Sequence, residues 1–182
     1  MQAGFPKKKV YIDEGIFERI LLGEQDAFRE LYEVSYRPLY AFLLSLTQNS
    51  EDAQDLLQDT YIQIRAKCHL YKHQGNPMAW MMKIGKNLFL MKCRKEEKRQ
   101  SISYEEMEQE LGFEDLSNAD NRLLLEKMFS VLSEEERNII IMRDVNGLKH
   151  REIAKLLEKP VGTILAKYNR GIRKLQKEFC ER

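Results

Sequence analysis

Residues 101–121 limit the possible folds of this chain more than any other feature of its sequence. They contain seven acidic residues and no lysine or arginine, and their apolar residues follow no clear helical or strand period. A segment of this kind is typical of a linker that forms at most a short helix. It separates a predicted domain at 10–100 from a second one at 122–182, and each is long enough to hold a small hydrophobic core.

Charge is concentrated on either side of this acidic linker. The chain has 30 basic and 29 acidic residues, so its net charge of +1 identifies no partner, while its hydrophobic fraction of 43% excludes a mainly disordered chain. Residues 78–100, however, carry a net charge of +5, and residues 147–182 carry +6. Each predicted domain therefore has one basic block that is a candidate surface for nucleic acid.

The cysteines and the N-terminal residues indicate where the chain resides. Cys68, Cys93 and Cys180 are odd in number and widely spaced, which is typical of reduced thiols in a cytosol. No apolar segment follows the lysines at 7–9, and no apolar run approaches the length of a membrane span. We therefore expect a soluble cytoplasmic protein without a signal peptide or membrane insertion.

Helical periodicity runs through both predicted domains, and no segment alternates apolar and polar residues as a strand does, so we predict an all-α fold. In the first domain we expect a helix before Gly23, a second from Asp26 to about Gln48 with a kink at Pro38, a third capped by Ser50, and a fourth that Asn76 caps and Pro77 begins. In the second domain we expect a helix at 120–132, a helix that begins with a capping box of Ser133 and Glu136 and ends at Asn146 and Gly147, and two more at 149–157 and 161–179.

The last two predicted helices have the form of a helix-turn-helix. Glu158, Lys159 and Pro160 give a connector of the length that joins the two helices of this motif. Helical spacing places one set of side chains of the second helix on a buried face: Val161, Ile164, Leu165, Tyr168, Ile172, Leu175 and Phe179. It places another set outside, where small side chains can approach bases and cations can contact phosphates: Thr163, Ala166, Lys167, Arg170, Arg173, Lys174 and Lys177. The alternative is a solvated basic face on a packing helix.

The helix predicted from Pro77 has a second basic stripe, formed by Lys83, Lys86, Asn87, Leu90 and Arg94, opposite an apolar side formed by Trp80, Met81, Ile84, Leu88 and Met91. The loop before it, residues 68–75, contains Tyr71 and His73, whose rings can stack on unpaired bases beside Lys72. A stripe that only faces water is the alternative, and we expect Trp80 to belong to the core.

The third predicted helix has the opposite charge. Asp52, Asp55, Gln58 and Asp59 share one side of it, while Ala53, Leu56, Leu57 and Ile64 line the other. The acidic side indicates a docking surface. For the acids of the first turn the simpler explanation is that they complement the helix dipole, but Asp59 lies two turns into the helix.

These motifs together resemble the sigma factors of the extracytoplasmic-function group of the sigma-70 family. The resemblance is carried by EDAQDLLQDTY at 51–61, AWMMKIGKNL at 79–88, GLKHREIA at 147–154 and PVGTI at 160–164, in the order and spacing of that group. It covers about 26–99 and 123–179, the two conserved domains of the group, and makes the acidic segment their linker.

The resemblance implies a transcription initiation factor that binds core RNA polymerase and directs promoter-specific initiation. It implies that Asp52, Asp55, Gln58 and Asp59 dock on the clamp helices of the largest polymerase subunit, and that the flap of the second-largest subunit is a further contact with polymerase. At the minus-10 element, promoter DNA would be opened and the resulting single strand held. The residues implied are Tyr71, Lys83, Lys86, Asn87 and Arg94. Double-stranded DNA at the minus-35 element would be read by the helix-turn-helix at 150–169 and the residues that follow, through His150, Arg151, Thr163, Ala166, Lys167, Arg170, Arg173 and Lys174. An anti-sigma factor is a further possible partner.

Three positions depart from the family pattern. Lys149 stands where a capping Ser is frequent, Leu165 where a Lys is common, and Met91 where an Asp is common. Leu165 lies at the edge of the predicted buried face, which favours a structural role for it over a contact with DNA.

Other classes of function stay open. A helix-turn-helix regulator that works without polymerase predicts a symmetric dimer and tolerance of changes at Asp55 and Asp59. A sigma-like decoy that occupies polymerase without opening DNA predicts indifference to the loss of Lys86 and Asn87. An enzyme is the least favoured class, because the pairs of carboxylates lie on exposed amphipathic faces with no convergent His or metal site, and neither a phosphate-binding loop nor a catalytic triad is recognisable. Cys68, His69, His73 and Cys93 match no standard zinc spacing, so we expect neither a metal nor a cofactor.

Overall fold

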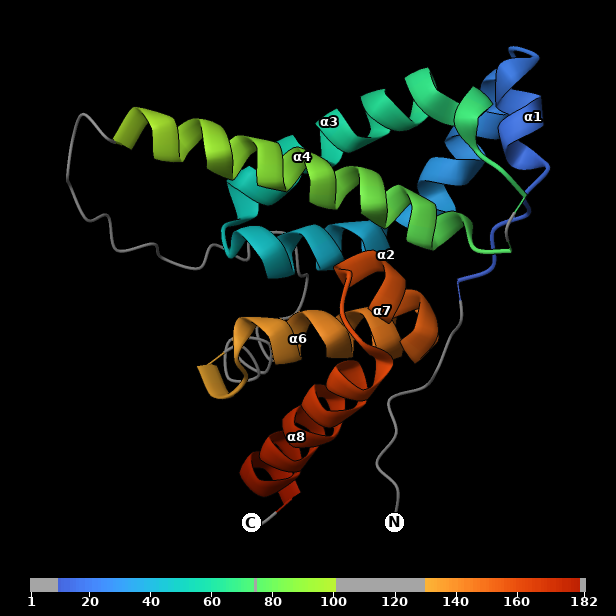
Figure 1. The fold of residues 1–182 in the computed structure, drawn as a ribbon. Helices are drawn as coiled ribbons and strands as arrows, with labels where there is room; N and C mark the ends of the chain where they lie inside the picture. The colour runs from blue at the N-terminus through green and yellow to red at the C-terminus, as the bar shows by residue number, and fades with distance from the viewer. Residues whose placement is uncertain (1–9, 74, 101–129, 181–182) are drawn as a thin grey trace. The chain divides into compact units, whose positions relative to one another are not determined.

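The computed structural model describes residues 10–73, 75–100 and 130–180, and in these residues the chain is helical with no strand. They fall into two compact units, one at 12–100 and the other at 130–180 (Figure 1). The prediction of an all-α fold is confirmed. The predicted linker lies outside the described residues, as does most of the helix expected at 120–132.

The first unit is built from four α-helices and a short 3₁₀ turn: α1 (Ile16–Leu21), α2 (Gln25–Thr47), α3 (Ser50–Lys67), η1 (Cys68–Leu70) and α4 (Pro77–Gln100). Figure 1 shows α4 lying across α2 and α3. Its core is made of fully buried apolar side chains from these helices, among them Phe17, Leu31, Leu39, Phe42, Leu43, Ile64, Met81 and Met82. Burial of these side chains, each contributing about 1.5–3 kcal/mol, stabilises the unit.

Side-chain caps fix where two of these helices begin. The Asn49 side chain accepts a hydrogen bond from the backbone N–H of Asp52 at 3.0 Å, so Asn49 caps α3 and the prediction of Ser50 was wrong by one residue. Asn49 has extended backbone angles, whereas Ser50 already belongs to the helix. The predicted cap of α4 is confirmed, because Asn76 accepts from the N–H of Ala79 at 3.0 Å.

A glycine sets how closely α4 approaches its neighbours. A Cβ atom at Gly85 would lie 2.7 Å from Cδ2 of Leu43 and 3.2 Å from Oγ1 of Thr60, so only a glycine permits this packing. Gly85 thus marks the side of α4 that faces the bundle. Met91 lies about 120° round the helix from it. This position explains why Met91 is 64% exposed, contrary to the prediction that it packs with Trp80 and Met81.

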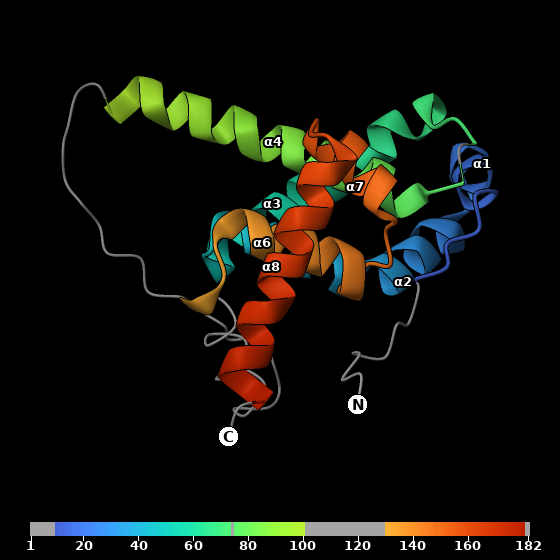
Figure 2. The ribbon, with the colours of Figure 1, turned by 60° about the horizontal axis from the view of Figure 1, so that its bottom comes forward.

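The second unit consists of α6 (Glu134–Ile140), a π-helical turn η2 (Ile141–Val145), α7 (His150–Leu157) and α8 (Val161–Cys180), which Figure 2 shows from a second direction. Its core contains the buried apolar side chains of these helices and their connections: Leu132, Ile139, Ile140, Met142, Leu148, Ile153, Ile164 and Leu175, with Tyr168 and Ile172 packed against them. The capping box of Ser133 and Glu136 is confirmed, with Glu136 accepting from the Ser133 N–H at 3.0 Å.

Two predictions for α8 were wrong. Val161 and Leu165 were placed on the buried face, but they are 37% and 40% exposed. The buried stripe runs through Ile164, Gly171 and Leu175, and Leu165 lies about 100° from Ile164 round the helix. Phe179 was assigned to the same face, and the surroundings of its side chain lie outside what the structure describes.

Candidate nucleic-acid interface

The acidic surface on α3, formed by Asp52, Asp55, Gln58 and Asp59, faces solvent over most of its extent. Asp55, Gln58 and Asp59 are exposed, while the apolar side of the helix is buried as predicted. Asp52 differs because its carboxylate forms an ion pair with Lys92 of α4. The hydrogen bond from Lys92 to Asp52 raises the pKa of this lysine. Three of the four predicted docking residues are therefore presented to solvent, and the fourth joins α3 to α4.

The basic stripe on α4 is also largely exposed. Lys83, Asn87 and Arg94 are exposed, Lys86 is half-buried, and Leu90 lies among them with 37% exposure. These residues recur at helical spacing along one side of an unbroken helix of 24 residues. The arrangement gives a line of hydrogen-bond donors and cations along α4 that is suited to a nucleic-acid backbone.

The aromatic loop before α4 is held by α1 and by Glu14 just before it, which the sequence did not indicate. The Tyr71 hydroxyl donates a hydrogen bond to Oε2 of Glu14 at 2.7 Å, and its ring centroid lies 4.3 Å from Phe17 and 5.3 Å from Trp80. Tyr71 is thus half-buried rather than open for stacking.

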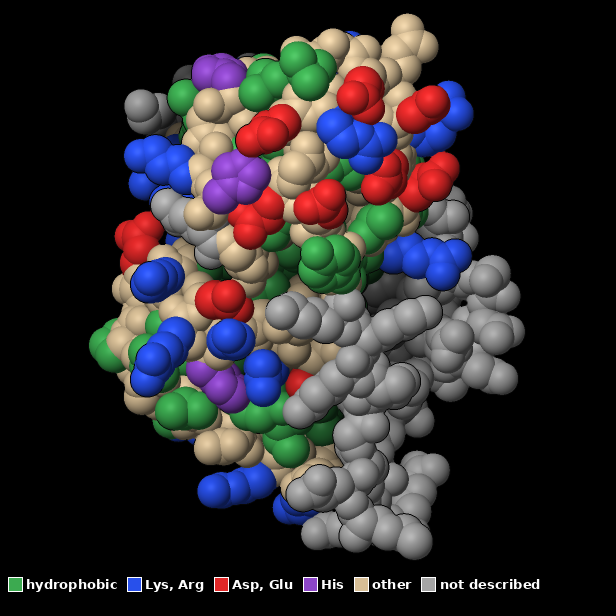
Figure 3. All heavy atoms as spheres, turned by 90° about the vertical axis from the view of Figure 1, so that its right-hand side faces the viewer, with side chains coloured by type: hydrophobic (Ala, Val, Ile, Leu, Met, Phe, Trp, Pro, Cys, Tyr) green, Lys and Arg blue, Asp and Glu red, His purple; other side chains and the backbone are tan. Residues whose placement is uncertain are grey.

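His73 also faces α1, because its Nε2 lies 3.1 Å from Oε1 of Glu18. Figure 3 shows acidic side chains next to histidine on this side of the molecule. Lys72 is exposed beside them, so the loop presents a cation and a histidine next to carboxylates.

The helix-turn-helix is formed by α7, the connector at 158–160 and α8, as predicted. Glu158 takes the left-handed conformation, with φ of 54°, and ends α7, while the Lys159 N–H donates to the Ala154 carbonyl at 3.0 Å. The His150 ring packs edge-on against Tyr168, with 5.0 Å between centroids. Tyr168 in turn donates to the Asp144 carboxylate at 3.2 Å. His150 therefore helps to join α7 to α8, in addition to any contact with DNA.

Some predicted DNA-binding residues of this motif are open to solvent and others are not. Arg151, Ala166, Arg170 and Arg173 are exposed, whereas Thr163, Lys167 and Lys174 are half-buried. The exposed side of α8 also includes Val161, Gly162, Leu165 and Asn169. The surface that α8 offers at its N-terminal end is therefore mostly small, apolar or amide-bearing.

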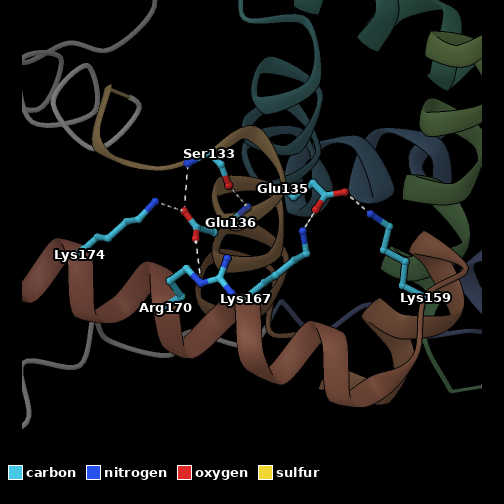
Figure 4. Close-up of polar contacts among 7 residues, drawn as sticks. All are labelled: Ser133, Glu135, Glu136, Lys159, Lys167, Arg170 and Lys174. Atoms are coloured by element: carbon cyan, nitrogen blue, oxygen red, sulfur yellow. Dashed lines mark hydrogen bonds and ion pairs between the residues drawn. The ribbon is translucent and has the colours of Figure 1, made fainter.

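Carboxylates of α6 hold several of the predicted phosphate-binding cations (Figure 4). Glu135 forms ion pairs with Lys159 and Lys167. Glu136 accepts from Lys174 at 2.7 Å and lies 4.0 Å from Nε of Arg170. Burial raises the pKa of Glu136, but the hydrogen bonds from Lys174 and Ser133 outweigh burial and leave that pKa below its ordinary value. Helical spacing does not indicate these pairs, because their partners lie more than 20 residues apart in the sequence.

The remaining site predictions concern metals and membranes. In the part of the chain that the structure describes, no group of three or more His, Cys, Asp or Glu residues is arranged to hold a metal ion. Cys68 and Cys93 form no disulfide there. None of the described helices combines the length and the apolar character that crossing a membrane requires.

Comparison with known families gives matches to both units. The model of Sigma-70 region 2 matches residues 31–99, and the model of Sigma-70, region 4 matches residues 122–175. The two matches follow each other in chain order and include α4 and the helix-turn-helix, respectively.

Curated relatives are similar over most of the chain. The ECF RNA polymerase sigma-E factor of Escherichia coli (strain K12) is 27% identical over 172 residues, which cover 87% of this chain and 90% of the relative. The ECF RNA polymerase sigma factor SigX of Bacillus subtilis (strain 168) is 23% identical over 166 residues, with 85% and 84% covered.

Solved structures share the fold. The sigma factor RpoE in complex with the anti-sigma factor NepR from Bartonella quintana gives a TM-score of 0.63 at 24% identity, covering 82% of this chain and 94% of that one. CnrH in complex with the cytosolic domain of CnrY gives a TM-score of 0.64 at 20% identity, covering 91% and 95%.

Proposed function

This chain belongs to the extracytoplasmic-function group of the sigma-70 family, and we propose how its two helical units divide the work of a sigma factor. A sigma factor binds core RNA polymerase and directs promoter-specific initiation of transcription, and it is a regulatory rather than a catalytic protein. The observation that carries the division is that region 2 matches the unit with the acidic surface and the basic stripe, while region 4 matches the unit with the helix-turn-helix.

The acidic surface on α3 docks on core polymerase, at the clamp helices of its largest subunit. Asp55, Gln58 and Asp59 support this assignment because they are exposed on one side of a helix whose other side is buried. Neither Asp55 nor Asp59 forms an ion pair with a residue that the structure describes, so both can pair with cations of a partner. Asp52 is less available to a partner, since its carboxylate already pairs with Lys92 of α4.

The basic stripe on α4 holds the separated strands at the minus-10 element. Lys83, Asn87 and Arg94 are exposed along α4 and can contact sugar and phosphate groups of one strand. Capture of an unstacked base by the neighbouring loop requires Tyr71 to leave Glu14, or else uses the exposed Lys72 and His73. The loop is therefore a second contact point, whose opening is coupled to α1.

The helix-turn-helix reads the minus-35 element as double-stranded DNA, and its unit meets the flap of the second-largest subunit. Arg151, Arg170 and Arg173 are exposed and suited to phosphates, while Ala166 and Asn169 are small enough to approach base edges in a major groove. Leu165 is exposed next to them and can contact a thymine methyl group, whereas its position in the sequence favoured a structural role.

An anti-sigma protein is a further partner. One solved structure of similar fold holds the sigma factor RpoE in complex with the anti-sigma factor NepR, and another holds CnrH in complex with the cytosolic domain of CnrY. We extend this association to the present chain, because the acidic and basic surfaces that polymerase and DNA require are exposed in it and open to a competitor.

The test is run-off transcription by core polymerase from a library of genomic fragments, with the wild-type chain and two double variants. Asp55→Ala/Asp59→Ala is expected to lose binding to core polymerase, and Lys83→Ala/Asn87→Ala is expected to keep that binding but lose promoter opening. Glu33→Ala, which removes an exposed carboxylate from α2, is the control and should transcribe like wild type.

Each alternative function predicts a different result. A chain that binds DNA without core polymerase and yields no transcript with it is a simple regulator. A chain that binds core polymerase but opens no promoter is a decoy. Either outcome overturns the proposal, and equal transcription by all variants overturns the assigned surfaces.

A further inference from the structure

Two lysines of the helix-turn-helix converge on a single carboxylate. Lys159 lies in the connector between α7 and α8, and Lys167 lies two turns into α8. Glu135 of α6 pairs with both, through Oε1 to Lys159 and Oε2 to Lys167 (Figure 4). Two ammonium groups thus meet one group that has two oxygen atoms and one negative charge. A phosphodiester has the same features, because its two non-bridging oxygens share one charge.

We propose that Lys159 and Lys167 form a binding site for one phosphate of the DNA backbone, and that the Glu135 carboxylate occupies this site until DNA displaces it. The proposal rests on the proposed binding of DNA by the helix-turn-helix. It adds Lys159 to the DNA-binding surface, and it gives Glu135 the role of an internal competitor that weakens the affinity of the protein for DNA.

Exposure of the three side chains makes such an exchange feasible. The side chains of Glu135, Lys159 and Lys167 are 43%, 37% and 27% exposed, respectively. Their ion pairs therefore lie at the surface, where ion pairs contribute little to stability. Glu136, in the same turn of α6, is 2% exposed and belongs to the capping box. Glu136 is therefore part of the structure of the unit, whereas Glu135 is replaceable.

Close packing of α6 against α8 brings Glu135 within reach of Lys167. A Cβ atom at Gly171 would lie 2.7 Å from Cδ1 of Ile140, so glycine at this position lets the two helices approach. The carboxylate consequently sits beside α8, and a DNA phosphate that approaches Lys159 and Lys167 meets it.

Removal of the competing charge is expected to strengthen DNA binding. In the wild type, displacement of Glu135 leaves a bare carboxylate near DNA, and this carboxylate recruits a cation that offsets part of the counterion release. Glu135→Gln removes this penalty. We expect its affinity for promoter DNA to rise about three- to tenfold, and the slope of log affinity against log salt concentration to steepen by about 1.

The matched control is Glu134→Gln. It removes the same charge from the neighbouring position of the same helix turn, where Glu134 is exposed and forms no ion pair with a residue of the described ranges. Long-range repulsion of DNA is therefore similar for the two variants. Only Glu135→Gln frees the two lysines.

The experiment measures binding of the sigma–core holoenzyme to a promoter duplex by fluorescence anisotropy at several salt concentrations. It compares wild type, Glu134→Gln and Glu135→Gln, and it adds Lys159→Ala/Lys167→Ala in the wild-type and Glu135→Gln backgrounds. The proposal expects Glu135→Gln to exceed Glu134→Gln in affinity and slope. It also expects loss of the lysines to cost more affinity in the Glu135→Gln background than in wild type.

Two results overturn the phosphate site. One is equal affinity and slope for the two glutamine variants, and the other is an effect of losing the lysines that does not depend on Glu135. Thermal unfolding of each variant shows whether a change in affinity reflects a change in folding. A wild-type holoenzyme that binds no promoter overturns the proposed function itself, and the phosphate site with it.

Discussion

The two units use acidic side chains in different ways. On α3 of the first unit, Asp55 and Asp59 are exposed, and neither pairs with a cation of the described residues. On α6 of the second unit, Glu135 and Glu136 together hold four cations from the connector and α8. Asp55 and Asp59 are thus available to another molecule, whereas Glu135 and Glu136 neutralise part of the chain's own basic helix.

This difference explains why charge counts mislead when they are used to locate a binding surface. Residues 147–182 carry a net charge of +6, but part of this charge is matched by α6, which precedes the block in sequence. The basic surface that DNA meets is therefore smaller than the sequence indicates. On α3, by contrast, the acidic surface is nearly as large as the sequence indicates.

The largest expected effect on stability follows from the loss of Glu136, and it tests whether this acid of α6 is structural. Glu136→Ala removes a nearly buried carboxylate, its pair with Lys174 and half of the capping box. We expect it to lower the free energy of unfolding of the second unit by about 2–3 kcal/mol. Asp55→Ala/Asp59→Ala should change the first unit by less than about 0.5 kcal/mol, because both side chains are exposed. Hydrogen exchange of the full chain, followed separately for each unit, measures both. Equal losses in the two units would contradict the distinction.

A second effect concerns what the two units have in common, a glycine where two helices meet. A methyl group at Gly85 would overlap Leu43, and one at Gly171 would overlap Ile140, each at 2.7 Å. We expect Gly85→Ala and Gly171→Ala each to destabilise the unit that contains it by about 1–2 kcal/mol, despite the better helix propensity of alanine.

Gly162→Ala is the control for these two variants. A Cβ atom at this position of α8 meets nothing within 4 Å, so the helix propensity of alanine should act alone and stabilise the second unit by about 0.5–1 kcal/mol. Chemical denaturation of the full chain measures all three variants. Stabilisation by Gly85→Ala or Gly171→Ala would show that the neighbouring side chain moves aside at little cost.

A third effect is a dependence of stability on pH in the second unit. The pKa of Glu136 lies below its ordinary value of 4.5 in the folded chain, so its charge stabilises the fold above that pH. This contribution is lost as the pH falls through the lowered pKa of the folded state.

Glu136→Gln keeps the cap but not the charge, so it should remove this part of the acid sensitivity at a smaller cost than Glu136→Ala. Unfolding by denaturant between about pH 7 and 3, monitored in the second unit, tests this expectation through the change in slope that glutamine causes. An unchanged slope in the variant would assign the acid sensitivity to other carboxylates.

The sequence predicted where each helix begins and ends better than how it is rotated about its own axis, and the reason is physical. Helix ends depend on local signals such as the capping box at Ser133, so most of them were placed within one or two residues. The rotation of a helix depends on which neighbours it meets. Met91 and Leu165 were placed on buried faces because they are apolar. The glycines that mark the buried faces have no side chain, so a hydrophobic pattern does not reveal them.

The candidate surfaces show the same limit. Spacing along α3 and α4 identified exposed stripes correctly, because both stripes lie within single helices. Spacing carries no information on contacts between elements, such as Tyr71 with Glu14 or Lys167 with Glu135. These contacts decide which predicted DNA-binding side chains are held inside the chain.

The smallest expected effect compares the starts of two helices in the second unit. At α6, Ser133 and Glu136 each cap the other's backbone N–H. At α7, Glu152 accepts from the Lys149 N–H at 2.6 Å, but the Lys149 ammonium cannot accept a hydrogen bond in return. Lys149→Ser would supply the missing acceptor, and we expect it to stabilise the second unit by about 0.5–1 kcal/mol.

Lys149→Ala separates this gain from an electrostatic one, because it removes the cation from the positive end of the helix dipole without adding an acceptor. If the serine hydroxyl is responsible, chemical denaturation will show a gain for serine and little for alanine. If both variants gain equally, the lysine was unfavourable through its charge. A complete cap would then give α7 no more stability than its half-formed cap does. The comparison between the two helix starts would fail.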